Sequence, residues 1–147
     1  MGELMTATHN FGTAPIRAAT TADTFKAALY LTSATVNAAT TAYSSTGEVT
    51  GTNYTAGGVT VTNATAPIAT NSSATAGVAY WTPSASITYT TVTLSTAFDA
   101  VLIYNSTQSN KAVSVHTFGS QTITAGTFTL TMPSNTTTTA LLRFSTT

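Results

Sequence analysis

The stretch Ala100-Val101-Leu102-Ile103-Tyr104 decides the fold, because it is a continuous apolar run of the length of a strand. A run of this kind is typical of a central strand that is buried on both faces. A polar turn follows at 105–110, and residues 111–118 then alternate between two faces. Together these segments predict an antiparallel hairpin that Gly119 ends.

Alternation on the N-terminal side of this hairpin predicts further strands. Residues 24–32 carry Phe25 and Leu29 on one face, and the glycine-rich stretch 51–58 indicates a loop before alternation resumes at 59–62. The apolar cluster 78–82 is stopped by Pro83, because proline cannot donate to a sheet ladder. In 87–94 each face mixes Thr with apolar residues, so we expect partial burial on both sides. The two faces are Ile87, Tyr89, Thr91 and Thr93 against Thr88, Thr90, Val92 and Leu94.

The C-terminal side completes an all-β pattern. Ile123, a turn at Gly126 and residues 128–132 predict another strand, and residues 141–144 close the chain. The best helical candidate, 35–40, is short and rich in Thr. About eight strands are expected in an antiparallel β-sandwich, with jelly-roll and immunoglobulin-like topologies both open. Two sheets packed face to face would bury Phe25, Leu29, Trp81, Leu102, Val113, Phe128 and Leu142.

The length of 147 residues suits one domain with a real core. Residues 1–22 are polar, Ala-rich and aperiodic, and we interpret them as an N-terminal arm ordered against a neighbour. The β-sandwich domain is expected over 23–147. The first five residues include Glu3 and lack a basic region, so no secretory signal is expected.

Charge is unusually scarce, with 5% charged residues and a formal net charge of zero. Four scattered cations, Arg17, Lys26, Lys111 and Arg143, cannot form the basic patch that nucleic-acid binding or a membrane surface requires. We therefore expect neither a nucleic acid nor a membrane as a partner. Thr makes up about a quarter of the chain and keeps exposed strand faces wet without charge repulsion. Such a surface suits an assembling protein, although a monomer solubilised by hydroxyls is an open alternative.

The sequence predicts no catalytic residue, no metal site and no cofactor. The chain has no cysteine, two histidines and four acids, Glu3, Asp23, Glu48 and Asp99. His116 lies in a predicted strand, where an interface or surface role is favoured over a catalytic one. Asp23 and Glu48 are expected to cap turns or to pair with Lys26 or Arg17. The ligand clusters that zinc or calcium need are missing from the sequence.

The aromatic residues are the remaining candidates for recognition. They could stack on a sugar, or they could fill the core with their hydroxyl groups at its edge, and their positions in predicted strands favour the core or an interface. The candidates are Tyr43, Tyr54, Tyr80, Trp81, Tyr89 and Tyr104.

In order and spacing, several segments resemble a family of small virion proteins of tailed bacteriophages. The matching stretches are 24–32, 51–58, Tyr80-Trp81, 100–105, 110–115, Phe118-Gly119, 126–130 and 140–144, and they span residues 23–144. The family carries acids where this chain has Thr or Ser, for example before Trp81. It supplies no catalytic residues to transfer, and its members are described as structural, decoration or tail-associated proteins.

The resemblance implies a capsid decoration or cement protein that binds the major capsid protein on the virion surface, after synthesis in the bacterial host cytoplasm. A tail, neck or fibre component that recognises the host surface is the alternative, and a cellular carbohydrate-binding or adhesin module is a third possibility. The arm, Thr6 to Ala22, is expected to extend across a neighbour and to add main-chain hydrogen bonds by β-augmentation. A homo-oligomer, dimer or trimer, is expected to multiply weak contacts through effective concentration. The candidate interface residues are Thr6, Thr8, His9, Phe11, Ile16, Arg17, Tyr54 and Lys111.

Overall fold

A computed structural model describes residues 23–62, 68–69 and 77–145, and this part of the chain contains strands and no α-helix. The strands are β1 (Phe25–Leu31), β2 (Val59–Val61), β3 (Ile68–Ala69), β4 (Val78–Trp81), β5 (Ile87–Asn105), β6 (Lys111–Leu130) and β7 (Leu142–Ser145). All pairings between them are antiparallel, so the predicted all-β antiparallel class is confirmed. None of these residues forms a helix capable of spanning a membrane. The predicted arm, residues 1–22, lies outside the described residues.

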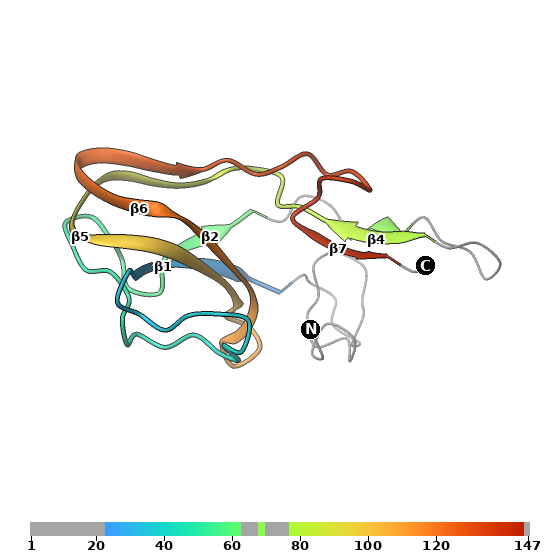
Figure 1. Cartoon of the computed structure of the whole chain (residues 1–147), viewed down its shortest axis with the longest axis horizontal. Helices are drawn as coiled ribbons and strands as arrows, with labels where there is room; N and C mark the ends of the chain where they lie inside the picture. Colours follow the sequence, from blue (N-terminus) through green and yellow to red (C-terminus); the bar gives the residue numbers. More distant parts are fainter. Residues whose placement is uncertain (1–22, 63–67, 70–76, 146–147) are drawn as a thin grey trace.

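The described residues form two sheets, one with the strand order β2-β1-β5-β6 and a smaller one with the order β3-β4-β7. The predicted sandwich of about eight strands is not confirmed, because the larger sheet forms both layers itself: β5 and β6 extend from the layer that they share with β1 and β2 into the layer above it. The long β5–β6 ribbon curls back, so its far half lies over β1 and β2 (Figure 1). Strand β5 pairs with β1 only from Phe98 to Asn105, which leaves residues 87–94 for the upper layer.

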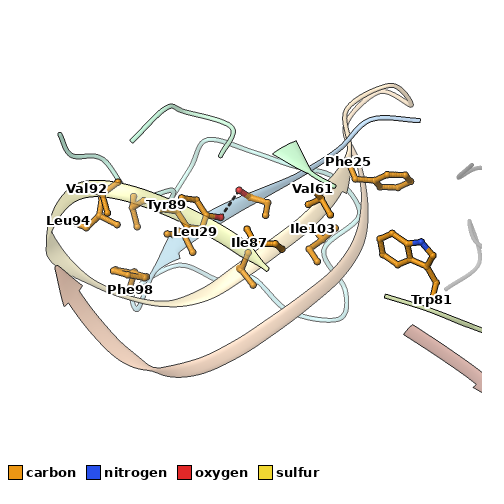
Figure 2. Packing of buried hydrophobic residues seen from close by; sticks show 13 residues of the cluster. Phe25, Leu29, Val61, Trp81, Ile87, Tyr89, Val92, Leu94, Phe98 and Ile103 are labelled. Atoms are coloured by element: carbon orange, nitrogen blue, oxygen red, sulfur yellow. Dashed lines mark hydrogen bonds between the residues drawn. The ribbon is translucent and has the colours of Figure 1, made fainter. Parts of the chain in front are cut away.

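The main core fills the space inside this curled sheet (Figure 2). The hydroxyl of Tyr89, from the upper layer, donates a 2.8 Å hydrogen bond to the carbonyl of Ala27 in the lower layer. The smaller sheet joins the same core through Trp81, whose ring lies 6.1 Å from that of Phe25. Of the predicted core residues, Phe25, Leu29, Trp81 and Leu102 are buried, whereas Val113, Phe128 and Leu142 are only partly buried.

A second apolar cluster covers the opposite face of β1 and β5. It consists of Ala28, Tyr30, Ala100, Leu102 and Tyr104, with residues from the 34–43 segment packed against it. Each residue of the 100–104 run is at most 5% exposed. The prediction of a central strand buried on both faces is therefore confirmed, as is its pairing with the strand that begins at Lys111.

The mixed faces predicted for 87–94 are wrong, because Thr91 adopts a φ of 52° and interrupts the alternation. Residues before and after this bulge therefore point to the same side. Ile87, Tyr89, Val92 and Leu94 are all buried in the main core. The side-chain Nδ2 of Asn53 donates to the carbonyl of Thr91 at 2.9 Å and stabilises the bulge.

Gly119 does not end its strand, since β6 continues from Lys111 to Leu130. The ribbon bends there instead of stopping, with register shifts between Leu94 and Phe98 and between Phe98 and Ala100 of its partner strand. A further shift between Ile103 and Tyr104 makes Val113 an extra residue in β6. The predicted faces of 111–118 are therefore interrupted after Ala112.

Candidate interaction groove along β6

A surface groove of about 390 Å³ runs along the first part of β6. Four consecutive residues of this strand, 112–115, line it together with Thr117. Val113 packs against the main core on one face of the sheet, and Ala112 and Val115 pack against the second apolar cluster on the other, so a groove that contacts all three lies along the strand edge. The floor of the groove is therefore the edge of β6, where main-chain N–H and C=O groups lie.

The loop 36–40 forms one wall of the groove, on the side of the second apolar cluster. Val36 packs against that cluster, and Asn37 holds the next turn in place. The Asn37 side-chain oxygen accepts from the Ala39 N–H at 2.8 Å, and the Asn37 N–H donates to the Thr40 hydroxyl at 3.0 Å. These side-chain contacts are typical of Asx turns, which give a short loop a defined shape.

Strand β7 forms the other wall, on the side of the main core. Leu142 packs against the main core, and Phe144 is an exposed large apolar residue at 36%. Arg143 also lines the groove, but its guanidinium donates to the carbonyls of Thr137 and Thr138, at 3.2 and 2.6 Å. The charge at this wall is thus already held by carbonyl acceptors.

The edge of β6 is open beyond Ala112. Loop 41–43 covers its start, where Ala112 N–H donates to the carbonyl of Thr41 and Tyr43 N–H to that of Asn110, both at 2.9 Å. Among the described residues, no strand pairs with the outer edge after this point. Residues 112–130 also contain no Lys, Arg, Asp, Glu or Pro, the residues with which proteins protect edge strands from pairing.

His116 lies beside the groove with its Nε2 atom 2.9 Å from the Ser114 hydroxyl. Burial lowers the pKa of His116, which favours the neutral ring at neutral pH. A catalytic serine additionally requires an acid that orients the histidine. Within the described part of the chain, no hydrogen bond joins His116 to a carboxylate, and the contact orders two side chains on the sheet.

Glu48 is a buried carboxylate, 6% exposed, that holds the loops at the opposite edge of the sheet. It accepts hydrogen bonds from the hydroxyls of Tyr43 and Tyr54, at 2.6 and 2.7 Å, and from the N–H of Gly57 at 2.7 Å. The expected turn contact is present through Gly57, but the two tyrosine contacts were not predicted. Three donors compensate the cost of burying this charge.

The tyrosines around Glu48 have raised pKa values. Burial is the main cause, and the nearby carboxylate adds to it, raising the pKa of Tyr104 to about 12 and those of Tyr43, Tyr54 and Tyr89 further. These phenols are protonated at neutral pH and act as donors. The cluster is therefore a structural hydrogen-bond network that fixes the 43–58 segment on β1.

The structure places two of the candidate interface residues apart from each other. Tyr54 is half-buried, and its ring stacks on Tyr89 with centroids 5.9 Å apart. Lys111 begins β6 and forms a β-bridge with Ala42 at the covered end of the groove. Thr6, Thr8, His9, Phe11, Ile16 and Arg17 lie outside the described residues, so their predicted role stays a prediction.

The groove itself was not predicted from the sequence. Its walls come from segments about 75 residues before and 30 residues after its floor, and nothing local indicates that they meet. The only available signal was the lack of charged residues and proline in 112–130, which marks an unprotected edge. Comparison with protein-family models, with curated proteins and with solved structures finds no match.

Proposed function

We propose that this chain is a structural protein of a bacteriophage particle, a decoration or cement protein that binds across major capsid protein subunits. The resemblance to small phage virion proteins supports the identity of the particle. The observation that carries the structural role is the open, uncharged edge of β6 at the floor of a two-walled groove. Such an edge favours binding of another chain by main-chain hydrogen bonds.

The mechanism is mechanical. A domain that sits across a junction buries surface on several capsid subunits, and the free energy of those contacts must be lost before the shell can expand or burst. A surface coated by Thr with a net charge of zero brings little repulsion between neighbouring copies. The chain therefore tolerates dense packing on a shell.

Copy number in purified particles tests this function. Gel densitometry against the major capsid protein is expected to give hundreds of copies, one set per symmetry-related junction. A few copies, or a few tens, would place the chain in the tail, neck or fibre and overturn the decoration role. Absence from the particle would overturn the virion assignment altogether.

A further inference from the structure

We propose that the β6 groove binds the N-terminal segment 6–11 of a second copy of this chain as an added β-strand. This inference deepens the proposed function, on which it rests, by naming the link between neighbouring copies. It commits to one partner, the same chain, and to one segment of it. Four properties of the described residues and of the sequence lead to this choice.

The floor of the groove offers main-chain partners. Beyond Ala112 no described strand pairs with the outer edge of β6, so its outward N–H and C=O groups can accept an extended segment. The lining residues of β6 run from Ala112 to Thr117. That is about 20 Å of strand, the length of about six extended residues.

The two walls favour binding of a single extended segment and disfavour pairing with the edge of another sheet. Loop 36–40 stands on one face of β6 and β7 on the other, so the groove is bounded on both sides. The β6 edge of a second copy carries the same two walls, and edge-to-edge pairing would bring the walls against each other. One extended segment avoids that conflict.

Residues 6–11 match the groove in length and chemistry. Twenty-two residues precede Asp23, and among them the stretch between Met5 and Arg17 carries no Lys, Arg, Asp or Glu. Pro15 cannot donate to a ladder, which leaves 6–11 as the neutral stretch free of proline and glycine. Thr6 and Thr8 favour extended backbone, and Phe11 provides an apolar anchor for a wall that exposes Phe144.

The geometry favours a second copy over the chain's own segment. Asp23 and Thr24 are tied to the turn after β5, with Asn105 Nδ2 donating to Asp23 at 2.7 Å and Thr24 N–H to the Thr107 hydroxyl at 2.9 Å. This point lies at the start of β6, where loop 41–43 closes the groove. The groove extends from this covered end to Thr117, and a neighbour's segment that approaches from Thr117 does not have to cross that loop.

The test measures self-association of the full chain by size-exclusion chromatography with light scattering over a dilution series. The unmodified chain is expected to associate in a concentration-dependent way. Only every second N–H of an added strand faces its partner, so the double variant Ala7→Pro/Thr8→Pro removes a facing N–H in either register. Ala38→Trp fills the groove from an exposed wall position. Each is expected to weaken association at least about tenfold, the proline variant because one or two main-chain hydrogen bonds are lost and Ala38→Trp because its ring occupies the space of the bound strand.

Matched controls separate these effects from general damage. Thr13→Pro lies in the same arm outside 6–11, and Ala39→Trp lies in the same loop outside the groove lining. Both should associate like the unmodified chain, and a synthetic peptide of residues 1–22 should compete. A monomer at every concentration, or normal association of the Ala7→Pro/Thr8→Pro variant, would overturn the inference. Because copy number in particles is measured independently, a failure here is distinguishable from a failure of the proposed function.

Discussion

At the scale of single residues, close backbone approaches fix the edge of the lower layer. Gly58 has a φ of 73°, and a Cβ atom on it would lie 1.6 Å from the carbonyl oxygen of Ala27. Only glycine fits there, because both the conformation and the space exclude a side chain. The glycine-rich stretch 51–58 was predicted as a loop, but this contact with β1 depends on the pairing of distant strands.

Replacing Gly58 tests this close approach. Gly58→Ala is expected to lower the free energy of unfolding by more than about 2 kcal/mol, because β2 must move away from β1. Gly119→Ala is the matched control, since its Cβ would meet nothing within 4 Å and its cost should stay within about 0.5 kcal/mol. Urea unfolding measures both, and equal stability of the two variants would contradict the packing described.

The Glu48 network gives a second prediction at this scale. Glu48→Ala removes the acceptor of three donors and is expected to cost about 2 kcal/mol or more, whereas Glu48→Gln keeps an acceptor and should cost less. Asp99→Asn serves as control, because Asp99 belongs to neither apolar cluster. Thermal unfolding, followed by circular dichroism, compares the melting temperatures of Glu48→Ala, Glu48→Gln and Asp99→Asn. Glu48→Ala unfolding at the temperature of the unmodified chain would refute the role of the network.

At the scale of elements, the sequence predicted the strands better than the points where they bend. The central run 100–104 was recognisable because burial on both faces leaves a continuous apolar signature. The bulge at Thr91 was not recognisable, since a Thr in the left-handed region has no compositional signal. Gly119 was misinterpreted as a strand end for a related reason. The same glycine is compatible with a stop and with a bend, and the pairing partner decides between them.

The Thr91 bulge has a testable energetic consequence. A β-branched residue at a φ of 52° is strained, so Thr91→Gly is expected to leave stability unchanged or to raise it by up to about 1 kcal/mol. Thr90→Gly, at the neighbouring exposed strand position, should instead cost about 1 kcal/mol. Chemical denaturation measures the free energy of unfolding of both variants. A Thr91→Gly variant as destabilised as Thr90→Gly would show that the bulge carries no strain.

At the scale of the whole molecule, one curled ribbon runs through both layers around the main core, and β1 and β2 complete the lower layer. The smaller sheet attaches to it through Trp81, and the 33–58 segment closes the other face and one edge. The groove results from this arrangement as a whole. Its floor and its two walls lie in three separate parts of the chain, which explains why sequence patterns predicted strands there but no site.

The buried tyrosines predict how stability depends on pH. Their folded-state pKa values lie above the ordinary value of 10.0, to about 12 for Tyr104. Between these values the folded chain holds more protons than the unfolded chain, so the free energy of unfolding falls as pH rises from about 10 to about 12. Thermal unfolding at pH 8 to 11.5 measures this decline, starting from about pH 10. A constant melting temperature across that range would contradict the burial of these hydroxyls.

Hydrogen–deuterium exchange of the backbone amides of 113–117 tests most directly whether the edge of β6 is the assembly surface. Some of these amides bond to β5 and others face the open edge. We expect the edge-facing amides to exchange rapidly in the dilute chain and to become protected in the assembled state, with the amides of β1 slow in both. Equal exchange at 113–117 in the dilute and assembled states would show that the edge is not where copies meet.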